Sequence, residues 1–181
     1  MTDLAAWSDR VSRSSEQLLE RFDKRYGYPP GVNVVVTGTG QGGSQLSQEL
    51  GPCTQVPPSI VEFFNVIEEV SLPDVWNGYF LGPATWVAAK HADRYPRWLE
   101  LGGQRVEILV IGSDGGGTLY VVGVEEDSPV FRIEEAAIES GVLCPTTDRQ
   151  VQRLAANFSA FLELFANSLE SYAAGGITPS V

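Results

Sequence analysis

The stretch RVEILVIGSDGGGTLYVVGV, residues 105–124, decides the fold. Its first part alternates apolar and polar residues and then becomes wholly apolar, and a second β-branched run follows the glycine-rich segment 112–117. Two such runs around a turn predict a β-hairpin with a loop longer than two residues. A third strand is expected at residues 130–133. Because these links are too short for a helical crossover, the three strands are expected to run antiparallel.

Helices are expected before and after this meander. Apolar residues recur at helical spacing in segments 4–22, 59–70 and 151–172, and shorter helices are expected at 44–50 and 85–93. Capping boxes can start two of them, with Ser59 and Glu62 in one and Thr147 and Gln150 in the other. Short strands are expected at 32–36 and within 76–81.

The order of these elements predicts an α+β fold, an antiparallel β-meander sheet with helices packed on it. With 181 residues the chain is expected to form one core. We expect residues 1–43 to hold an N-terminal helix, a short strand and a glycine-rich linker, packed on the domain. Residues 44–172 are then the domain itself, and residues 173–181 a flexible tail.

The charge of the chain is −11, and it is unevenly distributed. No Lys or Arg lies between Arg25 and Lys90, and Arg132 is the only base between residues 106 and 148. Such a body repels phosphate backbones and acidic lipid and attracts basic partners. We therefore expect neither nucleic acid nor membrane as a partner. The alternative is that acidity only keeps the protein in solution.

Targeting signals are not expected in this sequence. The first residues lack the basic head and apolar run of a secretory signal, and no apolar stretch approaches the roughly 20 residues of a membrane span. Cys53 and Cys144 are far apart and form no CxxC pair, so we expect two buried thiols in a reducing compartment. The cytoplasm is the expected location.

One motif resembles a dinucleotide fingerprint. Gly38, Gly40 and Gly43 have the spacing GxGxxG after a valine-rich segment. A dinucleotide fold needs repeated βαβ units, and the later strands are expected to form a meander. We therefore expect no cofactor, and we interpret segment 38–43 as a flexible linker.

Residues for catalysis or metal binding are not apparent. His91 is the only histidine, it has no cysteines or acids at zinc-ligand spacing, and the chain has no GxSxG elbow. We expect it at the surface or at a helix cap. Adjacent acids such as Glu68 and Glu69 diverge on a helix and do not converge across a cleft. We therefore expect a protein that is not an enzyme.

A binding surface is a better hypothesis. Three consecutive glycines, 115–117, exceed what a hairpin demands and would permit a partner to approach closely. We place the surface on helix 59–70, turn 74–79 and loop 112–117. The candidate partner-binding residues are Glu68, Glu69, Asp74, Trp76, Tyr79 and Asp114. Trp76 and Tyr79 would be anchors, since hot spots favour Trp and Tyr, and the acids would steer a basic partner. The alternative is that both aromatics lie in the core.

The order of short motifs resembles the SUKH superfamily. Glu49-Leu50-Gly51 resembles the element that ends a helix in that family, residues 58–64 its Pro-started helix, and Asn77-Gly78-Tyr79 its glycine turn. Segment 111–117 with the strand after it resembles the family's Gly-x-Asp-Gly-x-Gly signature, and residues 156–162 its closing helix. The resemblance covers roughly residues 44–165.

This resemblance implies binding without a shared enzymatic activity. The superfamily includes bacterial immunity proteins of polymorphic toxin systems and fungal regulators of cell-wall synthesis. The chain is therefore expected to be a non-catalytic protein-binding domain, and as an immunity protein it would neutralise a basic toxin of nuclease or deaminase type. Two alternatives remain: a regulatory or scaffold module without a toxin partner, and an enzyme that uses loop 112–117.

Overall fold

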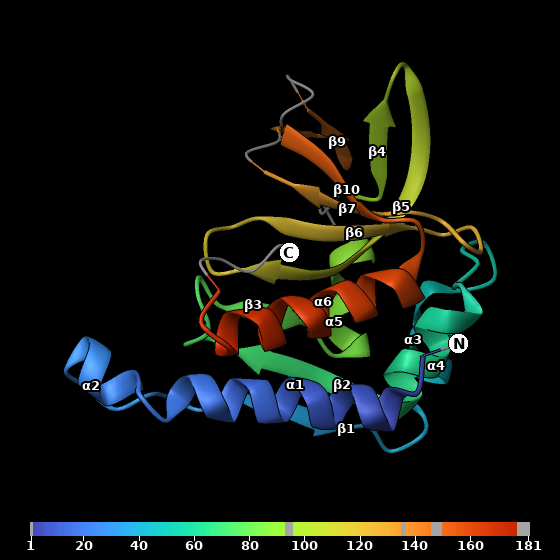
Figure 1. The fold of residues 1–181 in the computed structure, drawn as a ribbon. Helices are drawn as coiled ribbons and strands as arrows, with labels where there is room; N and C mark the ends of the chain where they lie inside the picture. Colours follow the sequence, from blue (N-terminus) through green and yellow to red (C-terminus); the bar gives the residue numbers. More distant parts are fainter. Residues whose placement is uncertain (1, 93–95, 135–136, 146–149, 177–181) are drawn as a thin grey trace.

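The computed structural model describes residues 2–92, 96–134, 137–145 and 150–176. It has the expected α+β fold, with helices packed on a sheet (Figure 1). The helices are α1 Leu4–Leu19, α2 Phe22–Tyr26, α3 Gly42–Leu50, α4 Pro58–Val66, α5 Ala84–Ala92 and α6 Phe158–Ala173. The strands are β1 Val34–Thr37, β2 Ile67–Leu72, β3 Tyr79–Leu81, β4 Trp98–Leu101, β5 Gln104–Asp114, β6 Leu119–Gly123, β7 Val130–Ile133, β8 Ala137–Glu139, β9 Val142–Cys144 and β10 Val151–Ala155. None of the helices in the described part of the chain is long and apolar enough to cross a membrane.

Strand β5 is the centre of the sheet. It pairs antiparallel with β4 through its first residues, with β6 through its middle and with β3 through its last residues. From β3 the sheet continues to β2 and β1, and from β6 it continues to β7 and β10. The β4–β5 end rises from the main sheet together with β9 (Figure 1). The expected antiparallel meander β5–β6–β7 is confirmed.

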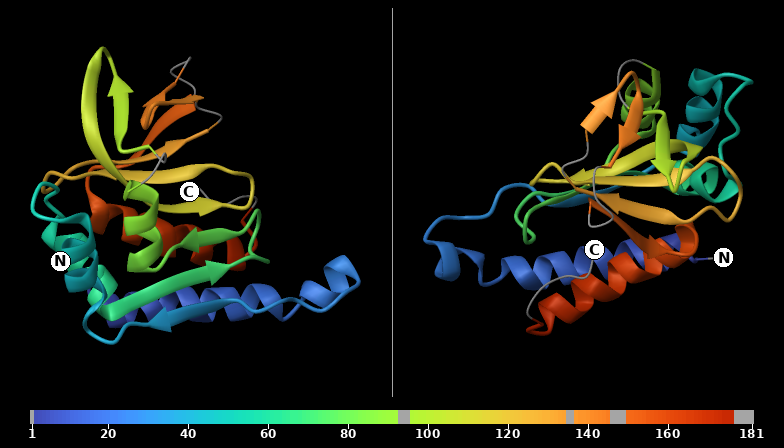
Figure 2. Two further views of the ribbon diagram at one scale, coloured as in Figure 1. Left: turned by 180° about the vertical axis from the view of Figure 1, so that it is seen from behind. Right: turned by 90° about the horizontal axis from the view of Figure 1, so that it is seen from above.

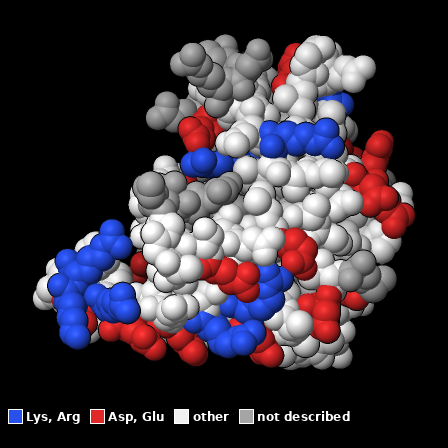
Figure 3. Space-filling model, viewed as in Figure 1, with Lys and Arg blue, Asp and Glu red and all other residues white. Residues whose placement is uncertain are grey.

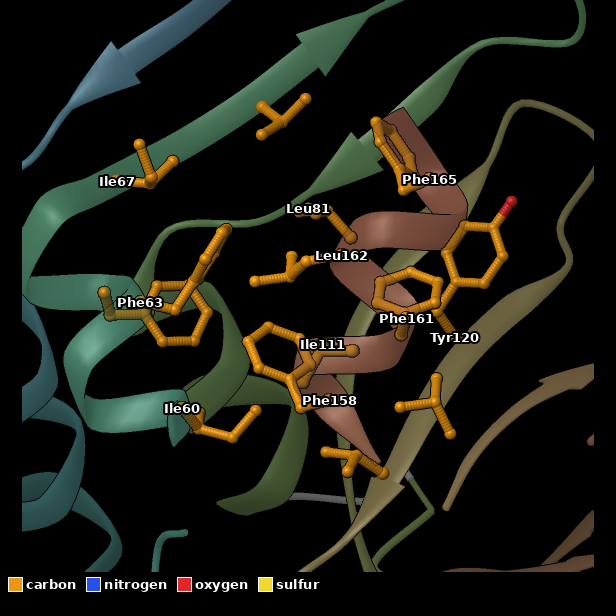
Figure 4. Packing of buried hydrophobic residues seen from close by; sticks show 14 of the residues in the cluster. Ile60, Phe63, Ile67, Leu81, Ile111, Tyr120, Phe158, Phe161, Leu162 and Phe165 are labelled. Carbon is orange, nitrogen blue, oxygen red and sulfur yellow. The ribbon is translucent and has the colours of Figure 1, made fainter. Parts of the chain in front are cut away.

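The wholly apolar part of β5 is buried on both faces. Leu109 and Ile111 belong to the larger core beneath α6, whereas Ile108 and Val110 belong to a second, smaller core. A strand covered on both faces needs apolar residues at successive positions and not at alternate ones. In Figure 4 Phe161 of α6 lies beside Tyr120 of β6, and their ring centroids are 5.8 Å apart.

The segment 59–70 is not one helix, contrary to our expectation. Helix α4 ends at Val66, and Ile67 begins strand β2, which pairs with β1 and β3. The apolar spacing predicted a helix, but Ile67 and Val70 are equally well buried when they belong to a strand. Pairing of this strand with a neighbour on each side then favours the strand over the helix. The N-cap is Pro57 without a side-chain hydrogen bond, so the expected capping box of Ser59 and Glu62 does not form.

We expected the last helix to begin near residue 151, but it begins later in the chain. Residues 151–155 form β10, which pairs with β7, and α6 begins only at Phe158. The side chain of Asn157 caps α6 by accepting a hydrogen bond from the Ala160 amide at 2.9 Å. The expected cap residue Thr147 lies outside the described residues. Strands β4, β8, β9 and β10 were not anticipated, and the β4–β9 pair is parallel.

The N-terminal stripe forms two helices, α1 and the short α2. Helix α1 lies beside α6 and runs in the same direction (Figure 2). Trp7 is fully buried, and its Nε1 donates to the Leu162 carbonyl oxygen at 2.7 Å. Arg10 forms ion pairs of 2.8 Å with Glu163 and Glu170 of α6. These contacts attach α1 firmly to the domain.

The glycine segment 38–43 is not a flexible linker. The Gly38 amide donates to the Val66 carbonyl oxygen at 2.7 Å, and Gly42 and Gly43 already belong to α3. A Cβ at Gly43 would collide with the Val61 carbonyl oxygen of α4. The glycines therefore allow α3 and α4 to approach closely, which is a packing role.

We expect Trp7→Ala to destabilise the protein strongly. Truncation of a buried tryptophan leaves a cavity and costs about 3–5 kcal/mol, which lowers the melting temperature by on the order of 10 °C. Glu16→Ala, at an exposed position of the same helix, is the matched control and should change stability by about 0.5 kcal/mol or less. Thermal unfolding followed by circular dichroism measures both. Equal melting temperatures for the two variants would contradict the docking of α1.

Candidate functional site

The turn of residues 73–78 and the loop of residues 114–118 meet at one end of the sheet. The Gly115 amide donates to the Gly78 carbonyl oxygen at 3.3 Å, and a Cβ at Gly115 would collide with the Asn77 carbonyl oxygen. Glycine at this position is therefore needed for an approach within the chain. Close approach of the Asn77 carbonyl oxygen is enough to explain a glycine at position 115, so a partner molecule is not needed to explain it.

Asp114 is a structural residue of this loop. It is 8% exposed, and its Oδ1 accepts hydrogen bonds from the amides of Gly116 at 2.9 Å and Thr118 at 2.8 Å. An Asp side chain that bonds to following amides stabilises a turn. The prediction that Asp114 faces a partner is wrong for this carboxylate, because it points into its own loop.

Tyr79 is a core residue and not an anchor. It is 1% exposed, and its ring packs edge-on against Phe165 with 5.5 Å between centroids. Burial raises the pKa of its hydroxyl well above the usual value. The alternative that Tyr79 lies in the core is thus correct, because β3 directs its side chain toward α6.

Asp74 fastens the chain before β1 to the turn. Its Oδ2 accepts hydrogen bonds from the Gly31 amide at 2.8 Å and from Asn33 Nδ2 at 2.6 Å. Asn33 Oδ1 accepts in return from the Asp74 amide at 3.1 Å. The carboxylate therefore acts mainly as a clamp within the protein.

Glu68 and Glu69 lie toward the other end of β2. Glu68 is exposed and Glu69 half-buried. Roughly 3.3 Å per residue along an extended strand separates Glu68 from Asp74 by on the order of 20 Å. The structure therefore does not bring the three predicted acids together beside Trp76, because the segment that carries two of them is a strand.

Trp76 has the backbone conformation least suited to its side chain. Its φ is 56°, in the left-handed region, and its side chain is 48% exposed. Its ring touches only the outer part of the fold, edge-on to Tyr172 at 6.0 Å between centroids. A positive φ in a bulky residue costs about 1–3 kcal/mol, and such strain concentrates at functional sites. The prediction that Trp76 is an exposed aromatic is confirmed.

Trp76 belongs to a larger exposed group that the sequence did not reveal. Among the described residues, six large apolar side chains are exposed, and five of them lie in segment 26–34 or in the turn that Asp74 ties to it. We call these five the apolar patch: Tyr26, Tyr28, Val32, Val34 and Trp76. The signal available in the sequence was the run Tyr-Gly-Tyr-Pro-Pro, which we interpreted only as a helix end.

The surface beside the patch is not uniformly acidic. Arg21, Lys24 and Arg25 of the α2 region are exposed, and Lys and Arg side chains gather over α2 in Figure 3. The Arg25 guanidinium lies over the Tyr26 ring at 5.3 Å. A groove of about 250 Å³ runs between α1, α2, the 74–75 turn and the end of α6. Aromatic and arginine side chains therefore share its walls.

A second polar cluster surrounds His91, which is buried and not at the surface as expected. Its Nε2 lies 3.4 Å from the Thr54 hydroxyl and 3.7 Å from Glu107 Oε1, and Arg97 pairs with Glu107 at 2.8 Å. Burial and then Arg97 lower the pKa of His91. A nucleophile–base pair needs a third side chain to orient the other ring nitrogen, and none of the described side chains bonds to the buried Nδ1. The cluster has the geometry of a structural junction.

Metal-binding groups and relatives give no further guide to the site. Within the described ranges, no three His, Cys, Asp or Glu side chains are placed to hold a metal ion. Cys53 is exposed and Cys144 half-exposed, so the expectation of two buried thiols is wrong. In comparisons with family models, curated proteins and solved structures, none matched this chain.

We expect Asp114→Ala to destabilise the protein by about 1–3 kcal/mol, because two amides in the loop lose their acceptor. Asp114→Asn retains an acceptor oxygen and should lose clearly less. Urea unfolding of the wild type and both variants measures this. If both substitutions cost the same, the charge of Asp114 and not its hydrogen bonds would be what stabilises the loop.

We expect His91 to make stability depend on pH just below neutrality. With its pKa lowered in the folded state, the unfolded chain binds the proton first as pH falls below about 6.5. Stability should therefore fall as pH decreases from 7.5 to 5.5. His91→Gln should reduce that slope, as followed by urea midpoints at each pH. Identical slopes in the two proteins would exclude His91 as the cause.

Proposed function

We propose that this chain is a non-catalytic protein-binding domain of the SUKH kind that acts as an immunity protein. It would bind a basic toxin domain of nuclease or deaminase type and neutralise it. Trp76, with Tyr26 and Arg25 beside the groove, would form the contact surface, in place of the acidic face expected from the sequence.

The observation that carries this proposal is the exposed Trp76 at a φ of 56°. Gly or Asn would adopt this conformation at lower cost, and a polar residue would suit solvent better. The left-handed backbone at Trp76 therefore costs folding free energy, although the exposed ring is not part of the hydrophobic core. Contact of this ring with another molecule would account for it.

The surroundings of Trp76 have the composition of a protein-binding surface. Trp, Tyr and Arg are the residues most enriched in interface hot spots. Trp76, Tyr26 and Arg25 lie around one end of the molecule, beside the 250 Å³ groove. The net charge of −11 would speed the encounter with a basic partner.

Two alternatives make different predictions. A regulatory or scaffold module would bind a partner that is harmless on its own. An enzyme using loop 112–117 would act without a partner, but the Asp114 carboxylate of that loop already accepts hydrogen bonds from the Gly116 and Thr118 amides.

The test separates folding from binding with Trp76→Asn. This substitution removes the ring and relieves the left-handed strain, so the melting temperature should be equal to or higher than that of the wild type. The tagged wild-type chain is used to capture proteins from its native host, and the captured protein is then expressed alone and with each variant. We expect it to arrest growth alone, wild type to restore growth, and Trp76→Asn to fail.

Val106→Asn is the matched control, because Val106 is the sixth exposed apolar side chain and lies on β5. It should restore growth like the wild type. Rescue by Trp76→Asn at the wild-type level would remove Trp76 from the binding surface. A captured partner that does not arrest growth would favour the regulatory alternative over immunity.

A further inference from the structure

Strand β1 forms a free edge of the sheet. It pairs with β2 on one side, and none of the described strands pairs with its other side (Figure 2). The ladder is regular from Val34 to Val36 and shifts by a bulge before Thr37. The outer backbone amides and carbonyls of this strand are therefore a template on which another strand can pair.

The edge lacks most of the features by which proteins protect such strands. Natural edges are commonly guarded by Lys, by other charges or by Pro within the strand. Residues 26–48 contain no charged residue, and Pro29 and Pro30 precede the strand. Only the shortness of β1 and its terminal bulge limit pairing.

One face of β1 is also apolar and open. Val35 packs on the main core, so by the alternation of strand side chains Val34 and Val36 point to the opposite face. Val34 is 38% exposed, and Val32, just before the strand, is 80% exposed. Pairing at this edge would bring β-branched side chains into contact on that face.

The distribution of charge indicates what fits there. Strand β1 itself carries no charge, and Glu69 lies one strand inward, opposite Val36 on β2. Two copies of a chain with a charge of −11 repel each other over most of their surface. The uncharged segment 26–48 is the place where two copies can meet with the least repulsion. A strand that pairs antiparallel with itself across a two-fold axis is also self-complementary.

We propose that β1 pairs antiparallel with β1 of a second copy, which joins the two sheets into one. The contact places Val34 and Val36 of one copy against those of the other. It leaves the groove beside α2 and Trp76 outside the strand pairing. This inference does not depend on the proposed function, because it needs no partner other than the chain itself.

The test is the oligomeric state of the full chain by sedimentation velocity over a range of concentrations. The wild type should be a dimer in reversible equilibrium. Val34→Lys places a charge on each side of the axis and should raise the dimer dissociation constant at least about tenfold. Val106→Lys is the matched control, since Val106 is a strand valine of 37% exposure on β5, and it should leave the constant unchanged.

Two further measurements guard against an indirect effect. Val32→Lys, which lies outside the regular strand, should also raise the dimer dissociation constant. The melting temperatures of all variants show whether they are folded. In the wild-type dimer, hydrogen exchange at the amides of residues 34–37 should be slower than in Val34→Lys. Because like charges are screened by salt, added NaCl should strengthen the dimer.

Several outcomes would overturn the proposal. A wild type that stays monomeric at all accessible concentrations would do so, as would a folded Val34→Lys that dimerises like the wild type. Dimerisation that is lost in Trp76→Asn and kept in Val34→Lys would move the contact to the groove. Failure to find a toxin would affect only the proposed function.

Discussion

The whole structure depends on one strand that is buried on both faces and paired with three neighbours. Strand β5 pairs with β4, β6 and β3 in turn, so the main sheet and the smaller β4–β9–β8 part are joined through its backbone. Leu109 and Ile111 contact one core, while Ile108 and Val110 contact the other. A polar residue at any one of these positions would place an unpaired polar group inside one of the two cores. The loop that begins at Asp114 continues directly from this strand, so its position depends on β5.

The Asp74 and Asp114 carboxylates form hydrogen bonds within the chain and so stabilise the fold. Asp114 closes its own loop, and Asp74 ties residues 31 and 33 to the turn that carries Trp76. In a chain with an excess of carboxylates, some of them replace the backbone as acceptors for amides in irregular segments. This explains why the acidic residues that the sequence singles out do not form one exposed acidic face. The Asp74 carboxylate instead ties Gly31 and Asn33 to the turn that carries Trp76.

The parts of the fold that could be predicted from the sequence are those decided by local patterns. The hairpin at 105–124 follows from its apolar runs and glycine turn, and the start of the chain follows from the spacing of Trp7 and Val11. Segment 59–70 could not be predicted, because Ile67 and Val70 satisfy both helix and strand spacing and only pairing with β1 and β3 decides. The same holds for Val151 and Leu154, which belong to β10, the strand that pairs with β7. The exposure of Trp76 was predicted, whereas the positions of Tyr79, Asp114 and His91 depend on which elements pack over them.

The left-handed conformation of Trp76 also bears on how the chain changes over generations. A single nucleotide change converts the tryptophan codon into a glycine codon, and glycine accepts this φ without strain. A Trp-to-Gly substitution at this position therefore needs one mutation and removes the backbone strain. Only selection for the tryptophan ring would oppose it. A lineage released from that selection should lose the tryptophan early, while Trp7, on which the core depends, should persist. The order in which the two tryptophans disappear would record when selection on the exposed ring, if the ring is selected, came to an end.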